Sequence, residues 1–289
     1  MKGIILAGGS GSRLAPCTNA ISKQLIPIHD KPMVFYSLSV LFLAKIKDIL
    51  IISTPEHIDL YKKILGNGSK YGASFTYVVQ DNPGGIAQAF ILGENFIGDE
   101  RVALILGDNI YYGSELPDRL EKAKLSSNAV IFSHSVNNPC SYGVLKYDEI
   151  GRPISIIEKP KDPPSSDAVT GLYFYDSSVV KIAKSLKPSN RKELEITDVN
   201  NKYMREGKLD VVKLGRGFAW LDTGTYESLN EASRFIEIIE NRQGNKVGCL
   251  EEIALTNEWI TKNDVLKIGL TMKNSSYGNY LIKLSHNEN

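Results

Sequence analysis

The sequence has few of the features that mark secreted, membrane-bound or nucleic-acid-binding proteins. Its 289 residues include three cysteines, Cys17, Cys140 and Cys249, which are far apart and form no C-x-x-C motif. An odd number of scattered cysteines argues against a disulfide framework and fits a reducing, cytoplasmic environment. No apolar run is long enough to span a membrane, and no secretory signal precedes the first strand-like segment. The net charge of +1 indicates neither a nucleic-acid nor a membrane partner.

The sequence also lacks the motifs of nucleophilic and zinc-dependent enzymes. It has no nucleophile elbow and no Ser or Cys triad. The four histidines show no metal-ligand spacing, so we assign no role to His29, His57, His134 and His286. These absences leave open phosphoryl and nucleotidyl transfer, because both proceed by positioning and charge stabilisation without a protein nucleophile.

The order of apolar runs predicts an α/β fold. Short buried strands alternate with helical segments from residue 4 to about residue 135. The runs at residues 48–53 and 101–106 are almost continuously apolar, which is typical of parallel strands covered on both faces. We therefore expect a doubly wound, mixed and mainly parallel sheet. We also expect one helix to start at residues 30–32 and another to cover residues 87–96.

The alternation changes near Pro139, where strands begin to follow one another. We predict a core over residues 1–225, with a first part at 1–138 and a substrate-binding part at 139–225 that shares the first sheet. Thr225 is expected to cap a long helix. Residues 226–289 then form a helical segment for oligomerisation or effector binding.

A glycine-rich loop follows the first predicted strand. Gly8, Gly9 and Gly11 allow the backbone to approach a ligand, and consecutive N–H groups in such a turn can hold an anion. Arg13 adds forked donors that suit a phosphate. Leucine stands at position 14, where a dinucleotide fingerprint needs glycine, and no P-loop lysine follows. The loop predicts a phosphate site at a strand end, with a tight turn beside a solvated arginine as the alternative.

Two acidic residues lie at the ends of other predicted strands. Asp108 follows the most hydrophobic strand, and Asp222 follows the strand at residues 218–221. Mg²⁺ takes carboxylate oxygens together with substrate phosphates, so these residues are candidate metal ligands. The alternatives are a turn cap for Asp108 and an interaction with a helix dipole for Asp222.

Further polar residues lie in loops next to predicted strands. Glu158 and Lys159 can grip a sugar phosphate, the carboxylate through hydroxyls and the ammonium through the phosphate. Lys23 can contact a phosphate, and the amides of Gln24 and Gln80 can read the edge of a base. The alternative for Glu158 and Lys159 is a surface ion pair, and the alternative for Lys23 is a solvated lysine. For Gln24 and Gln80, the alternative is a pair of amides that face solvent.

Together and in this order, the motifs resemble those of the sugar nucleotidyltransferases. More narrowly, the chain is similar to the short bacterial glucose-1-phosphate thymidylyltransferases over nearly its whole length. The motifs that carry the resemblance lie at residues 6–14, 22–25, 107–109, 142–144, 158–160, 169–173, 220–225 and 240–244. The residues alone indicate a nucleoside triphosphate and a sugar phosphate, and thymidine comes from the resemblance.

The resemblance implies an activity and a role for each residue. The enzyme would join dTTP and α-D-glucose 1-phosphate into dTDP-glucose and release pyrophosphate by in-line attack. Nucleotide binding would fall to Gly8, Gly9, Gly11, Ser12, Arg13, Lys23, Gln24, Gln80, Gly85 and Asp108. The sugar phosphate would be held by Asn109, Tyr142, Gly143, Glu158, Lys159, Val169 and Trp220. Asp108 and Asp222 would bind Mg²⁺ and act in catalysis with Arg13, Lys23 and Lys159.

The resemblance also implies partners and leaves alternatives. It implies a homotetramer, the first step of dTDP-L-rhamnose synthesis and an inhibitory site for that end product. A uridylyl- or cytidylyltransferase is one alternative, because one methyl group is worth only about 1–3 kcal/mol of discrimination between thymine and uracil. A non-catalytic regulator that binds a sugar nucleotide is another, although the charged residues favour catalysis.

Overall fold

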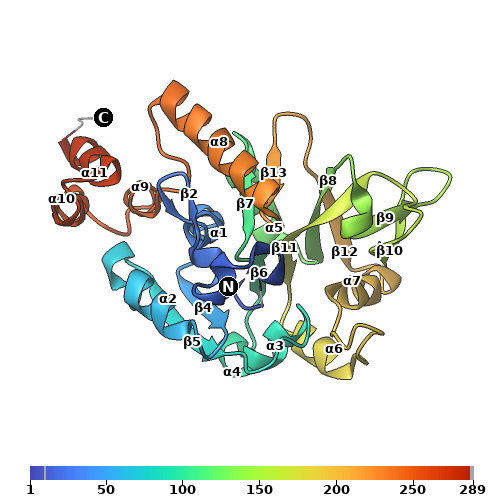
Figure 1. Cartoon of the computed structure of the whole chain (residues 1–289). Helices are drawn as coiled ribbons and strands as arrows, with labels where there is room; N and C mark the ends of the chain where they lie inside the picture. Colours follow the sequence, from blue (N-terminus) through green and yellow to red (C-terminus); the bar gives the residue numbers. More distant parts are fainter. Residues whose placement is uncertain (10, 287–289) are drawn as a thin grey trace.

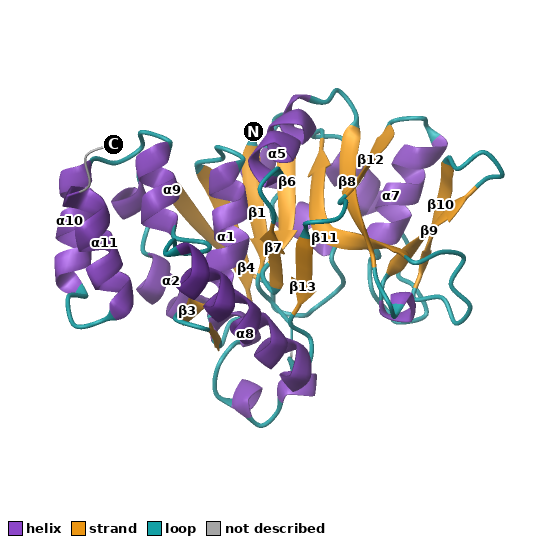
Figure 2. Ribbon diagram, turned by 90° about the horizontal axis from the view of Figure 1, so that it is seen from above, coloured by secondary structure: helices purple, strands orange, loops and turns teal. Residues whose placement is uncertain are grey.

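Residues 1–9 and 11–286 are described by the computed structural model, and they build one large sheet with helices on both faces (Figure 1). A group of helices from the C-terminal part of the chain lies at one end of the molecule, and a strand pair lies at the other (Figure 2). The sheet contains nine strands, and the predicted α/β fold class is confirmed.

Four parallel strands form the first half of the sheet. β1 (Lys2–Leu6) lies between β4 (Asp48–Ser53) and β6 (Val102–Leu106), and β5 (Ser74–Val79) pairs with β4. In the order β5-β4-β1-β6, the strands that follow β1 in sequence are added first on one side of it (β4, β5) and then on the other (β6). Sheets of this type bind ligands beyond the strand ends at such a switch point. The loops that follow β1 and β6 therefore lie next to each other.

The buried strands are apolar throughout because each has a core on both faces. Ile4 and Ile5 are both fully buried, but they belong to different hydrophobic clusters. The Ile5 face is covered by α1 (Val34–Leu43), α2 (Ile58–Leu65) and α5 (Leu116–Leu125). The Ile4 face is covered by α3 (Gln88–Leu92), α4 (Glu94–Ile97), α6 (Val179–Ser185) and α7 (Ile196–Arg205).

The second half of the sheet is mixed. β11 (Asp167–Tyr175) runs antiparallel to β6 and to β8 (Ala129–Ser135). β9 (Gly143–Tyr147) and β10 (Pro153–Glu158) extend the sheet beyond β11, while β12 (Leu209–Lys213) pairs in parallel with β8. The long strand β11 thus connects the two halves in one sheet.

Local structure differs from expectation at three places. The helix start expected at residues 30–32 is wrong: β2 (Pro27–Ile28) and β3 (Lys31–Pro32) form a hairpin, and α1 begins at Val34. The helix expected over residues 87–96 is divided at Gly93, where the backbone packs closely against the side chains of Ile4 and Leu50. The strand β7 (Asn109–Tyr112), which was not expected, pairs with β13 (Ala219–Asp222).

The C-terminal part is helical, as expected. Thr225 caps α8 (Tyr226–Gln243) and forms a capping box with Ser228. α9 (Leu250–Thr256) packs against α1, and α10 (Lys262–Thr271) packs against α11 (Ser276–His286). Within residues 1–9 and 11–286, no helix is both long and apolar enough to cross a membrane. The functional division at residues 138 and 225 stays a prediction.

Candidate active site

Two cavities meet at the carboxyl ends of β1 and β6, and both are lined by Arg13 and Asp108. The smaller has a volume of about 200 Å³ and is also lined by Gly8, Gly9, Gly11, Ser12, Lys23, Gln24 and Gly224. The larger, about 490 Å³, is also lined by Asn109, Tyr142, Gly143, Glu158, Lys159, Val169, Trp220 and Asp222. The structure thus brings together most of the predicted site residues in two adjoining spaces.

The glycine-rich loop requires glycine at specific positions. Gly9 and Gly11 have φ values of +113° and +58°, and a Cβ on Gly11 would lie 2.8 Å from a side-chain carbon of Thr18. The carbonyl of Gly11 accepts hydrogen bonds from the Leu14 N–H (2.8 Å) and the Thr18 hydroxyl (2.9 Å). These bonds hold Arg13 in a single helical turn beside both cavities. Residue 10 of this motif lies outside the described residues.

Two buried glutamines lie next to this loop. The amide oxygen of Gln24 accepts hydrogen bonds from Ser22 (2.8 Å) and Tyr61 (3.3 Å), which leaves its NH₂ group as the part that can bind a ligand. The NH₂ group of Gln80 donates to Gln88 (2.7 Å), and a Cβ on Gly8 would lie 2.4 Å from the Gln80 amide oxygen. Both amides are therefore oriented by neighbouring side chains. A side chain that recognises the edge of a base must be held in a fixed orientation in this way.

Gly85 joins the loop after β5 to the segment before α7. Its φ is +97°, and a Cβ there would lie 2.5 Å from the carbonyl oxygen of Leu194. Leu194 donates its N–H to Gly84 (2.7 Å) and accepts one from Ala87 (3.1 Å). This close approach aligns the loop with Ile86, which lines the larger cavity.

The two candidate metal ligands come from neighbouring strands. Lys23 Nζ lies 2.5 Å from Asp108 Oδ2, and β7–β13 pairing places Asp222 opposite Asn109. Thr223 donates its hydroxyl to the Asp108 carbonyl (2.9 Å), which ties the two strand ends together.

The electrostatics of these acids suit a divalent cation. Burial, followed by the negative charge of Asp108, raises the pKa of Asp222, while Lys23 and Arg13 oppose the increase. Burial, followed by Asp222, also raises the pKa of Tyr142 to about 12. The two carboxylates supply the hard oxygen ligands that Mg²⁺ prefers, and a cation bound there would offset the repulsion that, after burial, raises the pKa of Asp222.

Glu158 is oriented from two sides in the larger cavity. Thr197 donates its hydroxyl to Oε2 (2.5 Å), and Arg191 donates to Oε1 (3.2 Å). A Cβ on Gly143 would lie 3.4 Å from Oε2, so glycine leaves this carboxylate in place. Lys159 lines the same cavity, with its ammonium 3.9 Å from Glu158 Oε1.

Trp220 and Asn109 use their polar groups within the protein. The indole N–H donates to Asn109 Oδ1 (2.7 Å), which also accepts the Gly171 N–H (3.2 Å). The NH₂ group of Asn109 then donates to Asp108 Oδ1 (2.9 Å). Trp220 therefore supports Asp108 through Asn109, in addition to lining the cavity beside Tyr142.

Sequence reasoning missed Arg191 and Thr197. Both line the larger cavity, and both contact Glu158. Arg191 also forms an ion pair with Glu195 (2.7 Å). Both residues lie in a charge-rich segment whose composition is typical of a solvent-exposed loop. Only the folding of this segment against residues 84–87 brings it to the strand ends.

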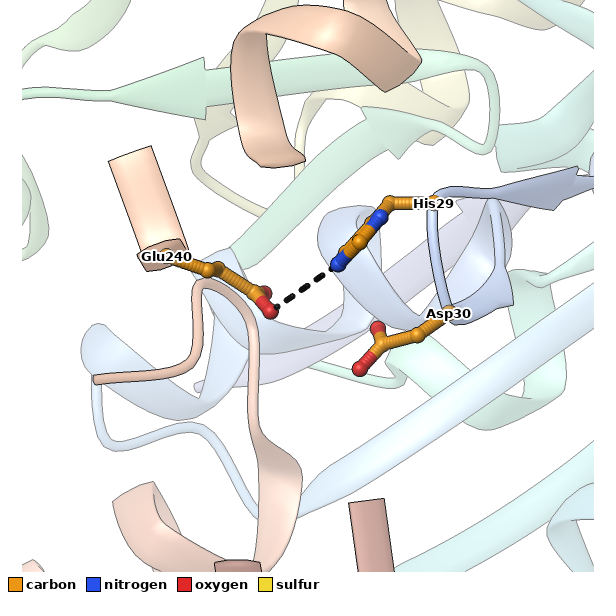
Figure 3. Close-up of side chains that lie close together, drawn as sticks. All are labelled: His29, Asp30 and Glu240. Carbon is orange, nitrogen blue, oxygen red and sulfur yellow. Dashed lines mark ion pairs between the residues drawn. The ribbon is translucent and has the colours of Figure 1, made fainter. Parts of the chain in front are cut away.

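A second acidic cluster, which includes a histidine, shares no residue with the lining of these cavities (Figure 3). His29 Nε2 lies 3.6 Å from Glu240 Oε2, and Asp30 completes the group. Lys31 pairs with both acids, at 2.6 Å from Asp30 and 3.1 Å from Glu240, and Lys246 also contacts both. Since two ammonium groups already neutralise the carboxylates, this cluster fastens α8 to the β2–β3 hairpin and is a poor cation site.

Comparison with known proteins identifies the family. The family model described as "Nucleotidyl transferase" matches residues 2–238. The chain belongs to the nucleotidyl transferase family. Among its relatives is a glucose-1-phosphate thymidylyltransferase from Neisseria meningitidis, 52% identical over 285 residues, which cover 98% of this chain and 99% of the relative. A protein of the same name from Mycobacterium tuberculosis is 48% identical, with coverage of 98% and 99%.

Solved structures of nucleotidyltransferases have the same fold. A Bacillus anthracis protein assigned as a glucose-1-phosphate thymidylyltransferase, crystallised with sucrose, superposes with a TM-score of 0.75 at 45% identity. The match covers 81% of this chain and 94% of that one. A UDP-glucose pyrophosphorylase bound to UDP-glucose shares the fold alone, with a TM-score of 0.71 at 24% identity, covering 82% and 98% of the two chains.

Proposed function

We propose that this nucleotidyltransferase transfers a thymidylyl group from dTTP to α-D-glucose 1-phosphate. The observation that carries the proposal is the meeting of two cavities at Arg13 and Asp108. The smaller cavity has the glycine-rich loop and the amide of Gln24 for a nucleotide. The larger cavity has the carboxylate of Glu158 and the positive charges of Lys159 and Arg191 for a sugar phosphate. The names of the relatives at about 50% identity supply the thymidine and the glucose.

The chemistry requires no nucleophile from the protein. An anionic phosphate oxygen of glucose 1-phosphate attacks the α-phosphorus of dTTP, and a new P–O bond forms. The bond to the bridging oxygen breaks, and its electron pair leaves with pyrophosphate. The nucleophile is already ionised at neutral pH, so no general base is needed. The protein contributes by aligning the two substrates and by offsetting negative charge.

Each cation of the site has a place in this reaction. Arg13, which lines both cavities, offsets charge on the triphosphate and on the departing pyrophosphate. Lys159 and Arg191 hold the phosphate of the sugar substrate, and Glu158 accepts hydrogen bonds from its hydroxyls. Gln24, Gln80 and Gly85 position the base. Asp108 and Asp222 would hold Mg²⁺, which supplies further positive charge for the phosphates.

A pyrophosphate-release assay across substrate pairs tests the proposal. We expect dTTP with glucose 1-phosphate to give the highest kcat/KM and UTP to give measurable but lower turnover. A clear preference for UTP or CTP would replace the thymidylyl assignment. Absence of pyrophosphate release with every pair would favour a non-catalytic regulator.

The metal assignment has a separate test. Asp108→Asn and Asp222→Asn should each lower kcat at least about 100-fold at saturating Mg²⁺, because charge stabilisation at the reacting phosphates is lost. Asp118→Asn, on an exposed position of α5, is the matched control and should leave kcat unchanged. Near-normal rates in both active-site variants would show that the metal binds elsewhere.

The assembly, pathway and regulation follow from the same proposal. We infer a homotetramer that serves dTDP-L-rhamnose synthesis and is inhibited by that end product. Light scattering in solution tests the tetramer, and inhibition of pyrophosphate release by dTDP-L-rhamnose tests the regulation. A monomer, or full activity at millimolar end product, would contradict these parts without affecting the reaction itself.

A further inference from the structure

Another cavity lies away from the candidate active site. It has a volume of about 900 Å³ and shares no lining residue with the two cavities described above. One wall comes from the β2–β3 hairpin, α1 and the segment after α2, and the other comes from α9, α10 and α11. In Figure 1 these helices stand beside α2 and α1 at one end of the molecule. The cavity therefore lies between the N-terminal core on one side and α9, α10 and α11 on the other, although α9 itself packs against α1.

The walls are mainly apolar and aromatic. Apolar side chains line both sides, among them Phe35, Ile64 and Tyr71 on the core side and Ile268, Met272 and Tyr277 on the helical side. Pockets for small organic molecules have this size and an apolar lining with a few placed polar groups. The space suits a flat apolar body.

Two polar side chains, Tyr71 and Glu251, lie at the buried side of this cavity. The Tyr71 hydroxyl is fully buried and has no hydrogen-bond partner in the described part of the chain. Glu251, 2% exposed, also lines the cavity, and its carboxylate accepts hydrogen bonds from the Tyr277 hydroxyl (2.6 Å) and the Cys249 thiol (3.8 Å). Buried polar groups are normally satisfied, so the unpartnered Tyr71 hydroxyl points to a ligand that offers a hydrogen-bonding group.

The rim carries positive charge. Lys70, Lys267 and Lys273 line the cavity, and Lys267 and Lys273 are exposed. The other lysine, Lys31, is held by Asp30 and Glu240. Lys70 lies over the Tyr71 ring, with 4.8 Å between its ammonium and the ring centroid. An anionic group at this rim would gain from these charges.

We propose that this cavity binds a small organic anion with a flat apolar body. The body lies between the aromatic and aliphatic walls, the acidic group contacts Lys267 and Lys273, and a hydrogen-bonding group faces Tyr71 and Glu251. Such a ligand joins the core to α10 and α11, so it stabilises the native state by mass action. The proposal depends on the geometry of this cavity and not on which substrates the active site uses.

The probe for the test is 8-anilinonaphthalene-1-sulfonate, an aromatic sulfonate whose fluorescence increases in apolar surroundings. Wild-type protein is titrated with the probe in the presence of saturating dTTP and Mg²⁺, so that active-site binding is blocked. Lys267→Glu/Lys273→Glu should weaken probe binding about tenfold, because two attractive charges become repulsive. Lys181→Glu, an exposed position on α6, is the matched control and should bind the probe as the wild type does.

Further measurements separate the outcomes. The probe should raise the thermal unfolding temperature of wild type and of Lys181→Glu, but not of the double variant, and pyrophosphate release should be equal in all three. Equal probe affinity in wild type and the double variant would overturn the proposal, as would displacement of the probe by dTTP. If light scattering shows that the double variant loses an assembly that the wild type forms, and probe binding is lost with it, the cavity is a subunit contact and the proposal is wrong.

Discussion

The ammonium nitrogen of Lys23 lies 2.5 Å from Oδ2 of Asp108, although the two residues are 85 positions apart in the chain. Lys23 is 9% exposed, so this charge is held inside the site and is not a mobile surface group. The pair offsets the charge of Asp108 and, through it, the repulsion felt by Asp222. Lys23 therefore acts on both candidate metal ligands, in addition to the phosphate contact that we predict for it.

Replacing Lys23 should change the pH dependence of the reaction. Lys23 lowers the pKa of Asp222, so Lys23→Met should raise that pKa further. Asp222 must be ionised to bind a cation, and activity falls as the pH drops through its pKa. The acid limb of the profile of pyrophosphate release against pH should move to higher pH, with a lower kcat. Lys23→Arg keeps the positive charge and should move the acid limb of the pH profile less. If Lys23→Met leaves the acid limb at the wild-type pH, Lys23 does not control the pKa of Asp222.

Asp222 should cost stability in the metal-free protein. Its folded pKa is raised above the ordinary value of 3.8, so the ionised form is less stable in the native state than in the unfolded chain. Asp222→Asn should therefore increase the free energy of unfolding in EDTA at pH 7. The gain should diminish as the pH falls and disappear well below 3.8, where the wild-type carboxyl is neutral in both states. Urea unfolding at several pH values measures this, and a destabilised variant at pH 7 would contradict it.

Trp220 should affect the metal site through Asn109. Trp220→Phe keeps the aromatic ring but removes the donor to Asn109 Oδ1, which costs about 1 kcal/mol and loosens the amide that donates to Asp108. We expect the Mg²⁺ concentration for half-maximal activity to rise about fivefold. Trp259→Phe, at a tryptophan that packs on Phe42 away from the site, is the control. If the two variants respond alike to Mg²⁺, Trp220 acts only as a wall of the cavity.

Gly85 and Gly98 provide a matched pair of backbone substitutions. Both have positive φ, at +97° and +55°, so alanine should cost about 1–2 kcal/mol at each position. A Cβ on Gly98 meets no described atom within 4 Å, whereas one on Gly85 would collide with Leu194. Gly85→Ala should lose more stability and raise the KM for dTTP, while Gly98→Ala should keep the wild-type KM. Equal KM values in the two variants would show that the Gly85–Leu194 contact does not position the nucleotide.

Two capping boxes allow a similar comparison. Thr225 caps α8 just after Asp222, and Thr261 caps α10 away from the site. Thr225→Ala and Thr261→Ala should each reduce the free energy of unfolding by about 1 kcal/mol. Only Thr225→Ala should lower kcat, because its helix start follows the candidate metal ligand. Unfolding and steady-state assays on both proteins test this, and a kinetic defect in Thr261→Ala would count against a local cause.

Several elements were predictable because their causes are local. The run at residues 48–53 is apolar enough to require burial on both faces, and it forms β4 as expected. Thr225 caps α8 because its own side chain reaches the backbone three residues later. Gly11 adopts positive φ, which glycine tolerates best. In each case the decisive contact lies within one turn or one strand.

The errors concern contacts made at long range. β7 was missed because its four residues are stabilised by β13, which follows more than a hundred residues later. A helix start was expected at residues 30–32, where the second half of a hairpin lies instead, because nothing nearby in the sequence shows that Lys31 is buried against Glu240. Arg191 was not predicted, because its contact with Glu158 at the larger cavity joins residues 33 positions apart.

Residue order alone was sufficient for the glycine-rich turn after β1, the alternation of strands and helices and the strand-end positions of Asp108 and Asp222. These features depend on backbone preference and on the period of the hydrophobic residues. The folded chain decided which charges face one another. Lys23 reaches Asp108, Trp220 reaches Asn109, and burial beside Asp108 raises the pKa of Asp222. Electrostatic energy depends on distance and exposure to water, and both are properties of the packed structure.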